Sequence, residues 1–282
     1  ITIAPTVTTP IITHVRGDGD LLEAWFRHYL RLGVGEFQVI VHGPRDENRE
    51  LYDLASRYPV RIEDAYEDEF DVREKKRRLD RLLERLAGQW VLMTDSDEFL
   101  ELPLGGLGTT IRLLQWAGAD VLYAPMLQHF NADGTLATPP VIEDPFAAQP
   151  LCSVDLYRRM GSQAAINKYP LFYCRPGTRL SDGGNHNPPE GCGQGMASLL
   201  GVTHHFKFRQ CVLERLNRRA DSGHTFRHES VGFLGYLESH DGRLPTDGAF
   251  PYSRRELFRR GLLRRPGWTW LKRKLVGQGD AP

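Results

Sequence analysis

Apolar runs and amphipathic stretches alternate along the first hundred residues. The apolar runs predict three buried strands, at 11–15, 37–41 and 60–62. Apolar residues at helical spacing predict helices near 21–30, 47–57 and 71–87. Because strand and helix in this rhythm imply right-handed crossovers, the sequence predicts an α/β fold with a Rossmann-like, mostly parallel sheet and helices on both faces.

A fourth apolar run, at 90–100, ends in the acidic sequence Asp95-Ser96-Asp97-Glu98. It is typical of a buried parallel strand whose carboxyl end opens into a crevice, which is where ligands bind in open α/β sheets. If the extended backbone continues, Asp95 and Asp97 lie on one side and Ser96 on the other. Two carboxylates about 5 Å apart repel by roughly 3 kcal/mol at an effective dielectric near 20. We therefore expect Mg²⁺ or Mn²⁺ there, although a helix cap or solvated loop is the alternative for an isolated Asp-X-Asp.

The pattern loosens in the second half of the chain. A helix is predicted at 111–116 and a strand at 121–125, and the irregular stretches 131–150 and 181–195 are expected to be loops over the crevice. We expect a nucleotide-binding half at 1–100, an acceptor-side half at 101–245 and a C-terminal helical extension at 246–282.

Alternation in the segment 203–209 separates polar from aromatic side chains. His205, Lys207 and Arg209 share one face, while His204, Phe206 and Phe208 share the other. The polar face is suited to a metal-bound diphosphate. A half-buried edge strand with a basic face is the alternative.

Three blocks of the sequence resemble one enzyme family. They are the acidic segment 90–100, the helix and glycine turn at 21–34, and the segment 205–208 with Tyr236 and Leu237. In this order they resemble the family 2-like bacterial branch of the GT-A glycosyltransferases. The resemblance implies a GT-A fold and metal-dependent, inverting transfer from a UDP-, GDP- or dTDP-sugar to a saccharide or lipid-linked acceptor, as in polysaccharide biosynthesis. It assigns the cation to Asp95, Asp97 and His205, and places Lys207 near the phosphates.

A further block with the same resemblance is 167–171 followed by 181–186. Here His186 competes with His205 for the metal, and Lys168 either donates to phosphate or extends its ammonium to solvent. Other nucleotide contacts are expected from strand tips, from the basic start of the long helix and from the acidic segment, namely Arg16, Asp64, Arg73, Lys76, Asp95 and Ser96. A solvated helix face is the alternative for the bases. Relatives carry Asn-Glu where this chain has 17–20, and aspartate where it has His42-Gly43, so the nucleotide base stays open.

An inverting enzyme also needs a carboxylate that accepts the proton of the acceptor hydroxyl. Glu143, Asp144 and Asp182 are the candidates in the irregular loops, and analogy with relatives favours Asp182. An ordinary turn aspartate is the alternative. We expect Asp97 to be an exposed crevice carboxylate, so that Asp97→Ala abolishes transfer and leaves the fold intact.

Composition limits the partners. The chain has 36 basic and 36 acidic residues, which disfavours nucleic-acid binding. The tail 254–275 is strongly basic with interleaved apolar residues, and it either lies on an anionic membrane or docks on its own catalytic domain. No membrane span or secretory signal is visible, so we expect a cytoplasmic protein, with peripheral membrane contact as the alternative open for the tail. The four cysteines are expected to be free thiols, with a Cys174–Cys192 bridge left open.

Two rival functions remain at this point. A nucleotidyltransferase needs a glycine-rich loop bearing Lys or Arg directly after the first strand, and only 16–19 hints at one. A non-catalytic sugar-binding protein is disfavoured, because acids, histidines and a lysine converge without a structural need.

Overall fold

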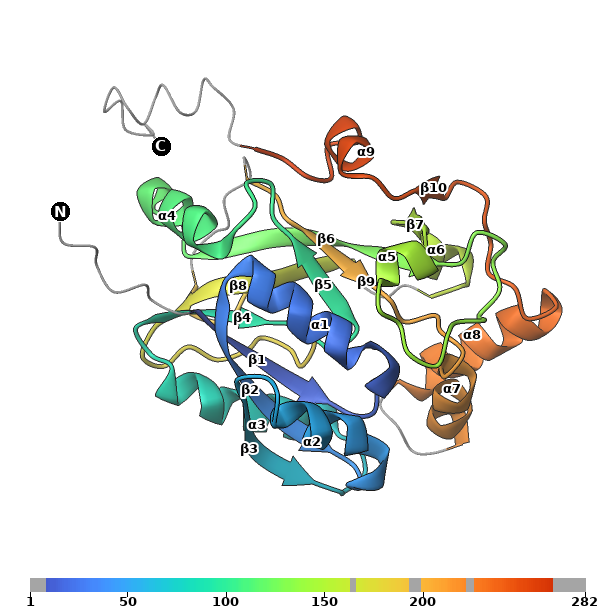
Figure 1. The fold of residues 1–282 in the computed structure, drawn as a ribbon, viewed down its shortest axis with the longest axis horizontal. Coiled ribbons are helices and arrows are strands. Elements are labelled where there is room, and N and C mark those ends of the chain that lie inside the picture. Colours follow the sequence, from blue (N-terminus) through green and yellow to red (C-terminus); the bar gives the residue numbers. More distant parts are fainter. Residues whose placement is uncertain (1–8, 163–165, 193–198, 222–225, 266–282) are drawn as a thin grey trace.

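The computed structural model describes residues 9–162, 166–192, 199–221 and 226–265 (Figure 1). Its strands are β1 (Thr9–Val15), β2 (Val34–His42), β3 (Val60–Tyr66), β4 (Gln89–Met93), β5 (Glu98–Glu101), β6 (Val121–Phe130), β7 (Leu151–Ser153), β8 (Asn167–Cys174), β9 (Val202–His205) and β10 (Phe250–Pro251). Its helices are α1 (Gly19–Leu32), the 3₁₀ turn η1 (Asp46–Asn48), α2 (Arg49–Ala55), α3 (Val72–Arg85), α4 (Leu107–Ala117), α5 (Pro145–Ala148), α6 (Leu156–Arg159), α7 (Val212–Asp221), α8 (Arg227–Ser239) and α9 (Arg254–Arg259).

The first half of the chain forms a parallel sheet in the order β3-β2-β1-β4. The chain moves outward from β1 through β2 to β3, and then returns to the other side of β1 as β4. The strand order therefore reverses between β1 and β4, and the carboxyl ends of these two strands flank that point. In open α/β sheets such a reversal marks the ligand crevice.

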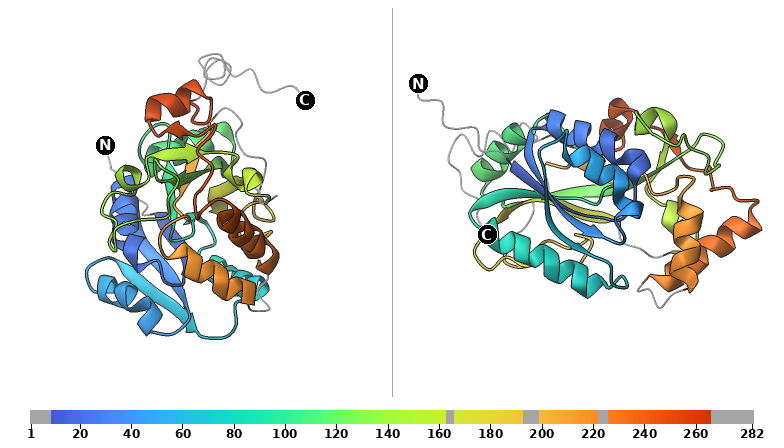
Figure 2. Two further views of the ribbon diagram at one scale, coloured as in Figure 1. Left: turned by 90° about the vertical axis from the view of Figure 1, so that its right-hand side faces the viewer. Right: turned by 60° about the horizontal axis from the view of Figure 1, so that its bottom comes forward.

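Helices cover both faces of this sheet, as the sequence predicted (Figure 2). On one face α1 buries Trp25, Phe26 and Tyr29 against β2 and the acidic segment. On the other face α3 buries Leu79 and Leu83 against β1, β2 and β4. The predicted α/β class with a mostly parallel, Rossmann-like central sheet is confirmed.

The second half of the chain extends the sheet with antiparallel pairs. Strand β8 lies between β4 and β6 and is antiparallel to both, while β9 is parallel to β6 and antiparallel to the short β5. This β5–β9 pair joins the acidic segment to the histidine segment. Two motifs more than a hundred residues apart in the sequence are thus neighbours in the fold.

The described part of the C-terminal extension docks on the sheet. Strand β10 pairs with β7, and Leu257 and Leu263 are buried against Leu127 and Val202. Arg254 forms an ion pair of 2.7 Å with Glu101 on β5. Of the two alternatives for the basic tail, docking therefore holds as far as residue 265, and the predicted tail from 266 onward lies outside the described residues. Within the described ranges, no helix combines the length and apolar character needed to cross a membrane.

Candidate functional site

A cavity of about 1300 Å³ opens where the strand order reverses. Its N-terminal wall consists of the loops after β1, β2, β3 and β4, together with the start of α3. Its C-terminal wall consists of residues from β9, α7, α8 and the loops 138–141 and 182–187. Residues from both halves of the chain thus line the cavity, at the position predicted for the crevice.

The acidic segment enters this cavity as a turn. Strand β4 ends at Met93, and the turn closes with the backbone N–H of Glu98 donating to the carbonyl of Asp95 over 3.1 Å. From α1, the indole N–H of Trp25 donates to the carbonyls of Asp95 and Glu98, at 3.2 and 3.0 Å. The prediction of a continued extended strand is wrong, because these hydrogen bonds favour a turn. Ser96 consequently also lines the cavity, where its hydroxyl donates to Asp18 over 2.7 Å.

Protein ammonium groups neutralise Asp95. Lys75 on α3 lies 2.7 Å from one carboxylate oxygen, and Lys168 on β8 lies 3.8 Å from the other. Burial opposes ionisation of Asp95, but these two charges outweigh it and lower its pKa to about 2. Lys168 also donates to Glu98 and to the carbonyl of Gly184, each at 2.6 Å. Lys168 therefore joins the acidic turn to the histidine-bearing loop.

Asp97 and His205 form the second part of the site. The Nε2 atom of His205 lies 3.3 Å from Asp97, and its Nδ1 lies 2.9 Å from the side-chain oxygen of Gln128. Since an amide oxygen can only accept, Nδ1 of His205 donates to Gln128, and Nε2 of the same ring faces the carboxylate of Asp97. Asp97 is only 6% exposed, so the prediction of an exposed carboxylate is wrong. Burial opposes its ionisation, but His205 and Arg215 hold the pKa of Asp97 well below its usual value.

The predicted three-ligand metal site is only partly assembled. Across the described ranges, no three His, Cys, Asp or Glu side chains come together as a metal cluster. Lys75 and Lys168 hold Asp95, whereas Asp97 and the oriented Nε2 of His205 remain a donor pair. A carboxylate and an imidazole fit Mn²⁺ or Mg²⁺ if phosphate oxygens complete the shell, because such ions normally take only one or two protein carboxylates beside a bound phosphate.

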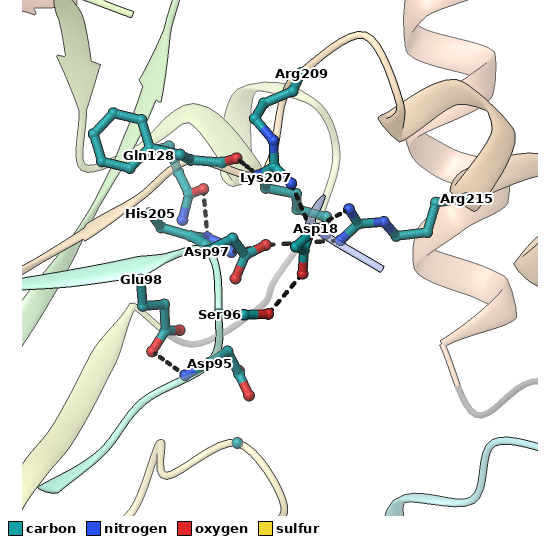
Figure 3. A network of polar contacts seen from close by, with 12 residues as sticks. Asp18, Asp95, Ser96, Asp97, Glu98, Gln128, His205, Lys207, Arg209 and Arg215 are labelled. Atoms are coloured by element: carbon teal, nitrogen blue, oxygen red, sulfur yellow. Dashed lines mark hydrogen bonds and ion pairs between the residues drawn. The ribbon is translucent and has the colours of Figure 1, made fainter. Parts of the chain in front are cut away.

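Two arginines connect the C-terminal half to the loop after β1 (Figure 3). Arg209 is fully buried and reaches Asp18 at 2.5 Å and Asp20 at 2.8 Å. Arg215 lies 2.6 Å from Asp18 and 3.8 Å from Asp97. Asp18 itself adopts a left-handed conformation, with φ of 59°. In the sequence this loop stood out as a departure from relatives and as a hint of a glycine-rich loop, and no local signal identifies its distant partners.

Most of the predicted site residues line the cavity: Arg16, Asp95, Ser96, Asp97, Lys168, Asp182, His205 and Lys207. The predicted alternation of the histidine segment holds except at Arg209, since His205 and Lys207 both line the cavity. His204, Phe206 and Phe208 are fully buried, but β9 ends at His205 and the Arg209 side chain turns inward to Asp18.

Four of the predicted site residues do not line the cavity. Asp64 pairs with Arg78, Lys76 pairs with Asp80 at 2.9 Å, and both Arg73 and Glu143 are exposed elsewhere. Lys75 occupies the place expected for its neighbours Arg73 and Lys76. Successive helix residues point about 100° apart, so a basic run can direct only some of its members to one site.

The loop 182–187 holds two predicted residues in a compact turn. The carboxylate of Asp182 accepts backbone hydrogen bonds from Gly184, His186 and Asn187. Burial opposes its ionisation, but these donors lower the pKa of Asp182. His186 donates from Nδ1 to the carbonyl of Asn167, and burial together with nearby Lys168 lowers its pKa to about 4. The geometry matches a turn aspartate that also faces the cavity.

An aromatic group that sequence analysis missed lies at the far end of the N-terminal wall. His14 bonds the hydroxyl of Tyr66 at 2.8 Å, and the rings of His42 and Tyr66 stack with centroids 4.6 Å apart. Phe70 lies with its edge toward His14. These residues come from the ends of three adjacent strands and the loop after β3. The available signal was the alternation of β1 and β2, which places His14 and His42 at neighbouring strand ends.

All four cysteines are free, so the Cys174–Cys192 bridge that was left open does not form. Cys211, at the rim of the cavity, is the exposed one.

No protein-family model and no curated protein matches the sequence. Among solved structures, the chain is similar to TarS 1–349 from S. aureus, with 10% identity, coverage of 83% of this chain and 72% of that chain, and a TM-score of 0.37. The same protein in complex with UDP-GlcNAc gives 9% identity, 86% and 75% coverage and a TM-score of 0.36. The 4-diphosphocytidyl-2C-methyl-D-erythritol synthase of Anaerococcus prevotii DSM 20548 gives 11% identity, 84% and 83% coverage and a TM-score of 0.29. At such low identities and TM-scores, these likenesses carry no argument about the reaction.

Proposed function

We propose that the chain is a glycosyltransferase that moves a sugar from a nucleoside-diphosphate sugar to a hydroxyl of a saccharide or lipid-linked acceptor. One observation carries the proposal: the acidic turn after β4 meets the loop after β1 at the reversal of strand order, inside a large cavity. The sequence resemblance to GT-A enzymes supports the same assignment independently of the fold.

Different residues of the cavity wall would bind the nucleotide base and the diphosphate. The aromatic group with His14, His42 and Phe70 offers flat surfaces for a nucleotide base. Asp97 and His205 would hold a divalent cation beside the diphosphate. When bound, that cation stabilises the charge that develops on the departing diphosphate.

Two lysines reduce the negative charge of the cavity wall near the proposed diphosphate position. Lys75 and Lys168 cancel the charge of Asp95 and of Glu98, so the diphosphate meets fewer free carboxylates. Of the three predicted bases, Glu143, Asp144 and Asp182, only Asp182 lines the cavity, and we propose it as the acceptor of the hydroxyl proton. Its lowered pKa keeps it ionised at neutral pH and makes it a weak base.

The loop after β1 disfavours the nucleotidyltransferase alternative. Between the end of β1 and the start of α1 only three residues intervene, and one of them is Asp18. Its carboxylate is already bonded to Arg209, Arg215 and Ser96. A triphosphate held by this loop would meet a buried acid rather than a cradle of lysine and free backbone N–H groups.

A thermal-shift panel of UDP, GDP, dTDP, CDP and ADP, each with and without Mn²⁺, tests the proposal. One diphosphate should raise the melting temperature with Mn²⁺ and much less without it. Asp97→Asn removes the charge that holds the cation and should weaken that diphosphate about tenfold or more. Asp155→Asn is the matched control, because Asp155 does not line the cavity and contacts its sequence neighbours Arg158, Arg159 and Ser153. Equal binding by Asp97→Asn and the control would contradict the proposed site.

A further inference from the structure

The C-terminal wall of the cavity carries an arginine row on α7. Arg215, Arg218 and Arg219 all line the cavity, since residues three and four apart share one helix face. Arg215 is neutralised by Asp18 at 2.6 Å, and Arg218 by Glu47 at 3.0 Å. Among the described residues, Arg219 has neither an ion pair nor a hydrogen-bond partner, although it is partly buried.

Three carboxylates act on Arg219 through their charge, those of Asp97, Glu229 and Asp18. Each is already bonded to another side chain: Asp97 to His205, Asp18 to Arg209 and Arg215, and Glu229 to Lys207 at 2.7 Å. That lysine also lies over the ring of Phe233, with its ammonium 4.6 Å from the centroid. Burial, and after it the charge of Arg215, lowers the pKa of Arg219, which remains a cation at neutral pH. Because the neighbouring carboxylates are bonded elsewhere, the charge of this partly buried guanidinium is only partly balanced, and an anion that binds it gains both a charge interaction and hydrogen bonds.

We propose that Arg219 binds an anionic group, a phosphate or a carboxylate, of the acceptor substrate. This inference rests on the proposed function. The donor already has its own positions at the reversal of strand order, on the N-terminal wall and at the Asp97–His205 pair. Single-ligand pockets hold about 300–1,000 Å³, and the cavity of about 1300 Å³ leaves room for a second substrate beside a bound donor. Arg219 lies on the C-terminal wall, and its planar guanidinium suits bidentate contact with either anion.

The test measures binding of small anions to the full chain saturated with its preferred nucleoside diphosphate and Mg²⁺. Methyl phosphate and glucuronate are the two probes, and they distinguish a phosphate-bearing from a carboxylate-bearing acceptor. We expect one probe to bind while the nucleotide stays bound. Arg219→Gln should weaken that probe about tenfold or more, Arg219→Lys should weaken it less, and neither should change nucleotide affinity more than about twofold.

Arg158→Gln is the matched control, because it removes the same charge from an exposed arginine outside the cavity. It should leave both affinities unchanged, and the melting temperatures of all variants verify folding. The inference is overturned if neither probe binds, if the nucleotide displaces the probe, or if Arg219→Gln weakens the nucleotide as strongly as the probe. In the last two cases Arg219 serves the donor diphosphate. If no nucleotide binds at all, the proposed function fails, whereas the comparison of wild type with Arg219→Gln in probe alone still tests the anion site.

Discussion

Lys168 offers the sharpest test of how the site is held together. Its side chain is almost fully buried, and its ammonium contacts buried Glu98 at 2.6 Å and the carbonyl of Gly184 at 2.6 Å. Lys168→Met keeps the approximate length of the side chain and removes the charge. Because Glu98 then remains as an uncompensated buried carboxylate, we expect a loss of about 3–5 kcal/mol in the free energy of unfolding.

The double variant Lys168→Met/Glu98→Gln separates this charge effect from packing. Replacing both partners of a buried pair is often close to neutral, so we expect the double variant to recover most of the loss. The amide oxygen of the new glutamine can still accept from the backbone N–H of Asp95, as Glu98 does at 3.3 Å. Urea unfolding of the wild type, both single variants and the double variant completes the cycle.

The pH dependence supplies a second readout of the same pair. Burial raises the pKa of Glu98, and loss of Lys168 removes the charge that opposes this rise. The folded variant then binds a proton that the unfolded chain, with a glutamate pKa of about 4.3, does not bind. The deficit of Lys168→Met should therefore shrink as the pH falls from 7.5 to 5.5. A deficit below about 1 kcal/mol at pH 7.5, or a double variant that only adds the single losses, would refute the reasoning.

Two further predictions concern the rim of the cavity and the core behind it. Cys211 is the exposed cysteine and lines the cavity, so a bound nucleoside diphosphate should slow its alkylation by maleimide, measured by mass spectrometry; an unchanged rate would place the nucleotide elsewhere. His28 donates from Nε2 to the carbonyl of Leu100 over 2.9 Å, and burial lowers its pKa to about 4. Between pH 6.5 and 4 the unfolded chain binds more protons at this residue than the folded chain. The free energy of unfolding therefore decreases as the pH is lowered, by about 2 kcal/mol from pH 7 to pH 5. His28→Gln should remove that part of the pH dependence in urea unfolding, and an unaltered slope would show that His28 does not titrate as described.

Local patterns predicted the N-terminal half of the fold because its strands and helices are adjacent in sequence. Each apolar run became a strand, and each amphipathic stretch became a helix on one face of the sheet. The second half was predicted less fully, because its pairings are long-range. The pairing of β8 with β4, for example, joins residues 167–174 to residues 89–93, and no periodicity within either segment indicates the partner.

The same distinction applies to the site. The place of the acidic segment at the cavity was predictable because an apolar run that ends in carboxylates is a local signal, whereas its turn conformation was not. The burial of Asp97 was not, since the chain that covers it arrives from β9 and α7, with His205 and Arg215. The choice of Lys75 over Lys76 depends on the rotation of α3 against β4, which a run of four bases cannot determine.

The charge balance around Asp95 and Asp97 changes the expected binding behaviour. From the sequence, these two carboxylates were expected to need an external cation, whereas Lys75, His205 and Arg215 already balance much of their charge. A lone Mn²⁺ would therefore meet protein cations, and a lone diphosphate would meet protein carboxylates. When they bind together, the diphosphate can attract Arg215 while the metal takes Asp97, so each ligand should raise the affinity for the other by the same factor. The nucleotide panel measures this coupling directly, because equal diphosphate affinity with and without Mn²⁺ would mean that the protein's own cations suffice.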